Sequence, residues 1–288
     1  MEKTPHSPHI DTLAPAEALR LVCGVFSAHF PGKSAEFITT VFQQAQNAFA
    51  GHHPGYQHCD TAFHDFAHTC QSTVAAARIL DGLLKSNPPP ALTVRDFELG
   101  ITGILLHDIG FLKDAGDDLG TGAKHAVVHV VRSATFAEGF LPHFGVTPDE
   151  IRIVQLAIRS TALNVDMSKL AFRDERERCL GCVVGTGDIL GTMAAPDYPE
   201  RLPALYQELV EAAEYSALGD GEIEDYQSAE DLLRKTRGFY RNYVLRMLDQ
   251  QWGQVYRALE HHFGDGRNHY LDAVEANLER IDRLLALG

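Results

Sequence analysis

Basic residues are scarce in this sequence. Its 288 residues include 25 lysines and arginines against 39 aspartates and glutamates, which leaves a formal net charge of −14. Because binding to a nucleic-acid backbone needs a concentrated basic surface, this balance argues against a nucleic-acid polymer as the main partner. An anionic substrate would need local cations or a metal ion to hold it.

Cysteines and long apolar runs are scarce as well. The five cysteines fit reduced thiols better than a disulfide framework. Cys179 and Cys182 form a lone CxxC, for which we expect buried helical thiols rather than zinc or redox chemistry. The N-terminal MEKTPHSPHIDTL lacks the apolar segment of a secretory signal, and the longest apolar run, LGITGILL from Leu99, is too short to span a bilayer. We therefore expect a cytoplasmic protein with no membrane partner.

Alternating and β-branched runs, which are typical of strands, are nearly absent, and helical periodicity dominates from end to end. We therefore predict an all-α protein with a single domain over 1–288, in which a core of about 50–195 carries C-terminal helices at 196–288. A homodimer through the long helix predicted near 229–263 is left open. The predicted helices cover about 15–30, 34–50, 64–85, 93–112, 122–141, 148–162, 174–194, 198–216, 229–263 and 268–286. Clusters of glycine, proline and acidic residues predict three loops: SNPPPALT from Ser86, KDAGDDLGTG from Lys113 and GDGEIEDYQSAED from Gly219.

Several polar residues interrupt stretches that are otherwise apolar. The segment FHDFAH places His64 and His68 four residues apart, on one face of a helix. His107 and Asp108 interrupt GILLHDIGFL, and Asp188 stands alone in VVGTGDILGTMA. A buried carboxylate is costly unless a cation compensates it. Nitrogen and oxygen donors from separate helices suit a divalent ion such as Mn, Fe, Zn or Mg in the core of a bundle.

The order of these residues resembles the HD superfamily of metal-dependent phosphohydrolases. The resemblance implies an HD-domain, phosphodiesterase-like helical bundle in which His68, His107, Asp108 and Asp188 bind one or two divalent ions (Mn, Mg, Zn, Fe or Ni), with Asp108 between them. More narrowly, FHDFAH resembles the HNxxH stretch of cyclic-nucleotide phosphodiesterases, in which the first histidine protonates the leaving alkoxide. His64 would then be the general acid, beside Asp108 in the catalytic set. The implied activity is metal-assisted hydrolysis of a phosphodiester or phosphomonoester.

The resemblance covers about residues 50–280 and includes GTGAKHAVVHVVRSATFAEGFL and GDILGTMAAPDYPERL, but it has departures. Phe63 stands where the phosphodiesterases have tyrosine, Asp65 replaces their asparagine, and Phe111 replaces the histidine that follows their HD aspartate. The residues that clamp a purine have no clear counterpart in DQQWGQVY. We therefore predict a small, nucleotide-like phosphoester without specifying a cyclic nucleotide. Asp65 is expected either to hold the His64 imidazolium or, as we favour, to cap the helix.

A second histidine pair follows the glycine-rich loop. His125 and His129 are four residues apart, and Arg132 follows one turn later. In one interpretation His129 faces a second ion or the phosphate, while Arg132 or Lys113 stabilises negative charge. The alternative is that both histidines only support the site or lie at the surface.

Two rival functions remain open. An HD-type di-iron oxygenase would add two histidines for a second iron. His129 could supply one, but in IRIVQLAIRSTA the other position is occupied by Arg159. A non-catalytic nucleotide-binding sensor domain is the other rival, although the complete ligand set and the presence of His64 argue against it.

Overall fold

The computed structural model describes residues 10–216 and 226–287, and the regular structure in these ranges is helical. A single β-bridge joins Tyr56 to Asp114, and no strand forms in the described ranges. The all-α prediction is therefore confirmed. Most of the acidic loop predicted from Gly219 lies outside the described residues.

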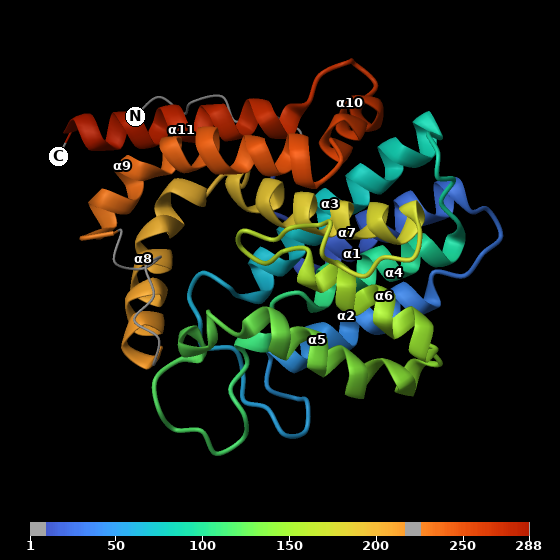
Figure 1. Ribbon diagram of the computed structural model, residues 1–288, viewed down its shortest axis with the longest axis horizontal. Coiled ribbons are helices and arrows are strands. Elements are labelled where there is room, and N and C mark those ends of the chain that lie inside the picture. The colour runs from blue at the N-terminus through green and yellow to red at the C-terminus, as the bar shows by residue number, and fades with distance from the viewer. Residues whose placement is uncertain (1–9, 217–225, 288) are drawn as a thin grey trace.

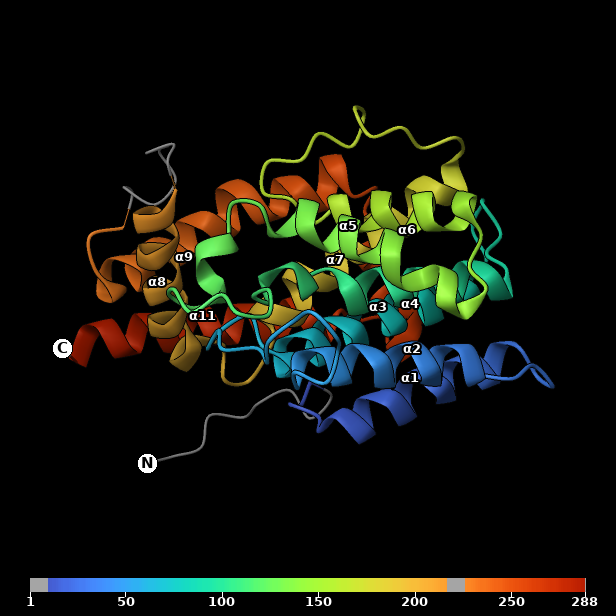
Figure 2. The same cartoon turned by 90° about the horizontal axis from the view of Figure 1, so that it is seen from below.

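The eleven α-helices of the described ranges form a layered bundle (Figure 1). Figure 2 shows α1 and α2 along one side, α3, α4 and α7 in the middle, and α5 and α6 beyond them. α9 and α11 lie side by side along one edge, and α8 runs across one end. The helices are α1 Pro15–His29, α2 Glu36–Phe49, α3 Phe66–Ser86, α4 Val94–Leu106, α5 His129–Phe140, α6 Pro148–Arg159, α7 Glu175–Met193, α8 Tyr198–Tyr215, α9 Ala229–Phe239, α10 Ala258–Phe263 and α11 His269–Leu287.

Side-chain caps fix where several helices begin. Thr93 and Thr147 form capping boxes with acidic residues three positions later, and Asp174 caps α7. Asp65 accepts a hydrogen bond of 2.8 Å from the His68 amide and caps α3. The cap interpretation of Asp65 is therefore confirmed.

The helix predicted over 93–112 ends earlier than expected. α4 stops at Leu106, and the chain continues through His107 and Asp108 into the 3-10 turn η1, Ile109–Phe111. Gly110 lets the start of α5 pack on this turn, because a Cβ there would lie 2.1 Å from the carbonyl oxygen of His129. The predicted helix over 122–141 likewise starts as a separate 3-10 turn, η2 Gly122–His125, before α5.

The single helix predicted over 229–263 is wrong. After α9 the chain forms two π-helical segments, η4 Tyr240–Val244 and η5 Met247–Gln251, then the 3-10 turn η6 Val255–Arg257 and α10. Gly253 and Gln254 have φ values of 57° and 58°, which no continuous right-handed helix allows. A further 3-10 turn, η3 Leu141–Phe144, follows α5.

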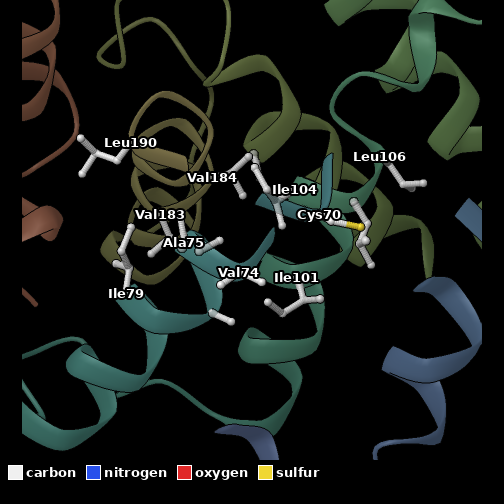
Figure 3. Close-up of a cluster of buried hydrophobic side chains, with 14 of the residues drawn as sticks. Cys70, Val74, Ala75, Ile79, Ile101, Ile104, Leu106, Val183, Val184 and Leu190 are labelled. Carbon is white, nitrogen blue, oxygen red and sulfur yellow. The ribbon is translucent and has the colours of Figure 1, made fainter. Parts of the chain in front are cut away.

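α7 lies at the centre of the bundle and packs closely on α3. A Cβ added to Gly187 would lie 2.9 Å from the Ala76 side chain, and one added to Gly191 would lie 2.7 Å from the Cα of Ser72. The absence of side chains at these two positions therefore lets the backbones approach. Figure 3 shows the apolar side chains of α3, α4 and α7 that fill the space around this contact. The approach also brings Asp188 of α7 toward the first turn of α3.

In the described residues no single helix is long and apolar enough to cross a membrane. Only the pair α7 and α8, taken together, has the length and apolar composition of a membrane span, and the two helices are bent by 110° relative to each other.

A buried carboxylate joins α1, α3 and α10. Asp81 lies 2.7 Å from His29 Nε2, 2.6 Å from His262 Nδ1 and 2.7 Å from Lys85 Nζ. Burial by itself would raise the pKa of Asp81, but hydrogen bonds from His262, Lys85 and His29 hold that pKa well below its usual value. The ionised carboxylate therefore stabilises the packing of these helices.

Replacing Gly191 with alanine is expected to destabilise the protein by about 1–3 kcal/mol, because the added methyl group meets the α3 backbone rather than a flexible side chain. Urea unfolding measures the change. Gly24→Ala is the matched control, since a Cβ there meets nothing within 4 Å, and it should be neutral or stabilising by up to about 1 kcal/mol. Equal effects of the two substitutions would contradict the close approach of α7 to α3.

Asp81→Asn is expected to lower the free energy of unfolding at pH 7 by about 3 kcal/mol, because it leaves the buried partners without their carboxylate. The pKa of Asp81 is lower in the folded protein than its unfolded value of about 4. Its carboxylate therefore contributes to the free energy of unfolding above pH 4, and this contribution is lost as the pH falls below 4. The difference in free energy of unfolding between wild type and Asp81→Asn, measured by urea unfolding, should therefore become smaller from pH 5 to pH 3. Asp272→Asn is the control, because Asp272 is half-exposed. Its free energy of unfolding should differ little from that of wild type at any pH.

Candidate metal centre

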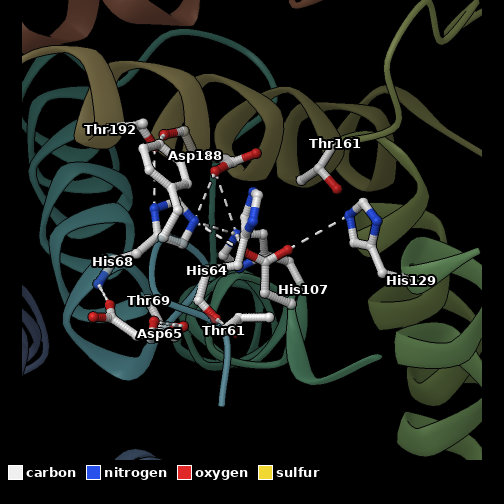
Figure 4. Close-up of polar contacts among 12 residues, drawn as sticks. Thr61, His64, Asp65, His68, Thr69, His107, His129, Thr161, Asp188 and Thr192 are labelled. Carbon is white, nitrogen blue, oxygen red and sulfur yellow. Dashed lines mark hydrogen bonds and ion pairs between the residues drawn. The ribbon is translucent and has the colours of Figure 1, made fainter. Parts of the chain in front are cut away.

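The four predicted metal ligands converge from three helices. His68 lies in the first turn of α3, His107 and Asp108 follow α4, and Asp188 lies in α7. The Nε2 atoms of the two histidines are 3.3 Å apart, and each lies within 3.5 Å of a carboxylate oxygen of both aspartates. His68, His107 and Asp108 are at most 2% exposed. Figure 4 shows His68, His107 and Asp188 pointing toward one point.

Hydrogen bonds on the far side of each imidazole fix its tautomer. His107 Nδ1 lies 2.6 Å from the carbonyl oxygen of Ile104, which can only accept, so Nδ1 carries the hydrogen. The Thr192 hydroxyl donates to the Asp188 carbonyl oxygen at 2.8 Å, so it accepts from His68 Nδ1 at 3.2 Å. In their neutral forms both rings therefore direct an Nε2 lone pair into the cluster, as metal-ligating histidines do.

The cluster needs a positive charge at its centre. Asp108 Oδ2 is buried, and among the described residues none donates a hydrogen bond to it. It faces the two Nε2 lone pairs at 2.9 and 3.1 Å. Burial lowers the pKa of His107, but the charges of Asp108 and Asp188 outweigh it and hold that pKa well above its usual value. Either a proton or a cation must therefore occupy the space between these atoms.

The donor set fits a divalent metal ion. Three potential ligand atoms lie within 4.8 Å of one another, one from each of His68, His107 and Asp188. Ligands held about 2.1 Å from a common ion lie about 3.0–3.4 Å apart in octahedral or tetrahedral geometry. The Nε2 to Nε2 distance of 3.3 Å and the distances of 3.3 and 3.5 Å to Asp188 Oδ1 are close to this range. Mixed nitrogen and oxygen ligation suits Mn, Fe, Zn, Ni or Mg.

The second oxygen of Asp108 faces a different histidine. Asp108 Oδ1 lies 3.6 Å from His129 Nε2, and His129 Nδ1 lies 2.6 Å from the carbonyl oxygen of Ala126. His129 therefore also directs an Nε2 lone pair toward the centre in its neutral form, and burial is the main reason that its pKa is lowered. Asp108 thus lies between two groups of donors, as a bridging carboxylate would.

His64 lies beside the cluster and is held by a residue that the sequence did not single out. Glu208 of α8 is buried, and its Oε2 lies 2.6 Å from His64 Nδ1. Its other oxygen accepts hydrogen bonds from the amides of Phe63 and His64. Burial lowers the pKa of His64, but the Glu208 hydrogen bond and nearby carboxylates raise it overall. Glu208 is one of several glutamates in an amphipathic helix, so no local pattern could have identified it.

α8 also anchors the FHDFAH segment through a second residue. Arg201 lies two turns before Glu208 on the same helix, donates to the Phe63 carbonyl oxygen at 2.5 Å, and lies 3.1 Å from Asp65 Oδ1. The same guanidinium covers the Phe63 ring at 5.3 Å. α8 therefore fixes the segment that carries His64.

Phe111 stands where the resemblance to phosphodiesterases would predict a histidine. Its buried ring is nearly parallel to that of His64 at 4.4 Å and lies 4.5 Å from the ring of His129. The side chain therefore packs against both imidazoles and limits their rotation.

Lys113 does not join the cluster but braces a loop. Its ammonium group is largely buried, donates to the Gly120 carbonyl oxygen at 2.7 Å, and lies 2.9 Å from Asp60 Oδ2. These contacts close the glycine- and aspartate-rich loop after η1. The predicted role of Lys113 in binding phosphate therefore has no geometric support.

Arg132 has a similar structural role. It donates to the carbonyl oxygens of Gly110 at 2.8 Å and Leu112 at 2.8 Å, which holds the turn that follows Asp108. These bonds use Nε and one of the two Nη groups, so a phosphate contact by Arg132 stays a prediction. His125 lies on η2, and its buried Nε2 has no hydrogen-bond partner among the described residues. A substrate contact by His125 stays a prediction.

The CxxC residues lie away from this centre in α7. Cys179 is partly buried and Cys182 is buried, and both are free thiols. Burial raises the pKa of Cys179 to about 11 and that of Cys182 to about 12, which makes both thiols poor nucleophiles near neutral pH. The expectation of buried helical thiols is therefore confirmed for Cys182 and holds in part for Cys179.

Manganese or zinc is expected to raise the Tm of the metal-free protein, because a cation relieves the repulsion around Asp108 Oδ2. Metal at about 100 times its Kd adds about 2.7 kcal/mol, which corresponds to a shift of several degrees. Differential scanning calorimetry with and without metal measures the shift. The isosteric Asp108→Asn variant should respond much less, and an equal response of both proteins would place the ion elsewhere.

Comparison with known protein families gives a match over most of the chain. The sequence profile of the Npun_R2479-like family matches residues 45–262, a range that contains the convergent cluster, His64, His129 and Glu208. No curated protein matches the chain. Since the matched range covers more than half of the sequence, the chain belongs to the Npun_R2479-like family.

Proposed function

We propose that this protein is an HD-type metal-dependent phosphohydrolase that cleaves a small phosphodiester or phosphomonoester. One observation carries the proposal: Asp108 Oδ2 is buried between two imidazole lone pairs, next to a third histidine that is paired with a carboxylate. A cluster of acceptors requires a proton or a cation at its centre, and the mixed nitrogen and oxygen donors suit a metal ion, while the adjacent His64–Glu208 pair supplies a separate proton donor. Helical packing alone would require neither.

His68, His107, Asp108 and Asp188 would hold the ion. A divalent ion held by such ligands stabilises phosphoryl oxygens and makes water a better nucleophile near neutral pH. Asp188 is the most accessible of the four, with 23% of its side chain exposed, so substrate would approach from its side. Asp108 Oδ1 faces His129, and these two residues would hold a second ion if the activity uses one.

His64 is the general acid in this mechanism. Its Nδ1 is bound to Glu208, so the proton to be transferred lies on Nε2, on the edge of the ring away from Glu208. The ring centroid lies 5.6 Å from that of His68 and 6.3 Å from that of His129, so the acid stands beside the ligand cluster. Glu208 stabilises the imidazolium, as a buried carboxylate partner does. Protonation of the leaving oxygen contributes about 10²–10⁴ in rate.

The rival functions receive less support. An oxygenase of this type needs another histidine near His129, where the sequence was expected to offer Arg159; Figure 4 shows Thr161, two residues later, on the His129 side of the centre. A sensor without catalysis would not require the buried Glu208 to hold His64 in one orientation. The substrate class remains a small, nucleotide-like phosphoester, with Mn, Mg, Zn, Fe or Ni as the ion.

His64→Asn and Asp108→Ala are expected to fail in different ways. Asp108→Ala should lose bound metal and activity, because it removes the oxygens that face both groups of donors. His64→Asn should keep its metal and lose about 10²–10⁴ in kcat with an alkyl phosphoester. With p-nitrophenyl phosphate the loss should be much smaller, since that leaving group needs no proton. Elemental analysis and steady-state kinetics measure the two effects.

The exposed His52 provides a matched histidine control, and His52→Asn should retain both metal and activity. Glu208→Gln should follow His64→Asn in its dependence on the leaving group, with full metal content. Equal metal loss in the His64 and Asp108 variants would contradict the division of roles. Wild-type protein that is fully loaded with metal and hydrolyses no phosphoester would contradict the proposed activity.

A further inference from the structure

A cavity of about 450 Å³, a size typical of small-molecule sites, lies at the start of α7. Four segments line it: the end of α3, the proline-rich loop that follows, the first turns of α7, and the turn that leads through η6 into α10. Arg178 in its wall lies ten residues before Asp188, about 15 Å along the helix axis. No residue of the candidate metal centre lines this cavity, so the two are separate sites. We call it the α7 cavity.

Close backbone packing fixes two walls of the α7 cavity. A Cβ added to Gly82 of α3 would lie 1.8 Å from the carbonyl oxygen of Ala258, so α10 rests directly on α3. On the other side, a Cβ added to Gly253 would lie 3.6 Å from Cys182 Sγ of α7. Ala258, Gly253 and Cys182 all line the cavity. Its walls are therefore held by the packing of the helices and do not depend on a ligand for their shape.

Much of the lining is apolar. Leu83 and Leu84 come from α3, Leu92 and three consecutive prolines at 88–90 come from the loop after it, and Val255 comes from η6. These side chains would remove the apolar part of a small ligand from water.

Two arginines in the lining have no carboxylate partner. Most arginines in the part of the chain that the structure describes pair with an aspartate or glutamate, as expected in an acidic protein. Arg178 and Arg257 both line the cavity, and neither forms an ion pair with a described residue. Glu175 is the one acid among the described residues of the lining, and it pairs with neither arginine. The cavity therefore carries an excess of positive charge.

The half-buried Arg178 lies on the cavity side of α7. Burial raises the pKa of Cys182 to about 12, and Arg178 is near enough to this thiol to oppose part of that rise. Since Cys182 lines the cavity, the guanidinium beside it is placed to reach a ligand there. Arg257 enters from the opposite wall, where its guanidinium lies 5.9 Å from the Tyr256 ring. Guanidinium groups bind carboxylate and phosphate through paired N–H donors.

The backbone of one wall is unusual. Gln254 lines the cavity with a φ of 58°, a conformation that residues with a side chain rarely adopt. It follows closely on the π-helical segment η5, which ends at Gln251. Both features are costly in isolation and gather at functional sites in proteins. A ligand site at this turn accounts for their position beside the two arginines.

We propose that the α7 cavity binds a small molecule with one carboxylate or phosphate group on an apolar body, and that Arg178 and Arg257 hold the anionic group. The excess of positive charge favours an anion over a neutral or cationic ligand, and the aliphatic lining favours an apolar remainder. The inference concerns a second ligand site and does not rest on the proposed function.

Titration calorimetry of the metal-loaded protein tests both halves of the ligand. Hexanoate or hexylphosphonate should bind about tenfold or more tightly than 1-hexanol, which lacks the charge, and than acetate, which lacks the apolar part. The tighter of the two anions identifies the group as a carboxylate or a phosphate. Asp108→Asn should keep this binding, because Asp108 does not line the cavity. Binding that disappears entirely in Asp108→Asn belongs to the metal centre and would overturn the inference.

Arg178→Gln and Arg257→Gln should each raise the Kd of the tighter anion about tenfold and leave the weak binding of 1-hexanol unchanged. Arg246→Gln is the matched control, because Arg246 is exposed like Arg257 and does not line the cavity. It should bind the anion as wild type does, and an unchanged Tm of each variant shows that it is folded. Equal Kd values for the anions and 1-hexanol, no anion binding, or unchanged Kd values in both cavity variants would overturn the inference.

Discussion

The structure depends on the burial of one carboxylate among imidazoles that, in their neutral forms, present only acceptor atoms to it. Asp108 Oδ2 faces His68 and His107 in a space from which water is nearly excluded, and the far sides of both rings are fixed as donors. Such a cluster is unstable unless a positive charge enters it. The same requirement explains why residues from α3, α4 and α7 meet at this point. The candidate function follows from that requirement rather than from the helical fold, which is compatible with many activities.

Two packing features bring the cluster together. The glycines of α7 let that helix approach α3, so that Asp188 reaches the histidines. α8 crosses one end of the bundle and holds the FHDFAH segment through Arg201 and Glu208, so that His64 keeps one orientation. Lys113 and Arg132 brace the loops on either side of η1. Lys113 and Arg132 therefore have a structural role beside the centre.

The four residues that converge could be singled out in the sequence because they conflict with their surroundings. His107 and Asp108 follow an apolar run that gives no local reason for a histidine and an aspartate. Helical periodicity gave the all-α class separately. Glu208 shows the opposite case, because a glutamate in an amphipathic helix looks the same whether it is solvated or holds a histidine. Its role arises only from the tertiary contact with His64.

Other features also depended on tertiary structure. Lys113 and Arg132 looked free to bind phosphate because backbone carbonyls leave no sequence pattern. The break after α9 occurs partly at Gln254, a residue that rarely adopts positive φ. Phe111 was recognised as a departure, but its packing against His64 and His129 was visible only in the structure.

The central claim is that His68, His107, Asp108 and Asp188 bind a cation together. The most direct test is anomalous diffraction at the manganese edge from crystals grown with manganese. The account predicts a strong peak within bonding distance of both Nε2 atoms and of carboxylate oxygens from both aspartates. Full manganese occupancy elsewhere with no peak among these four side chains would contradict it.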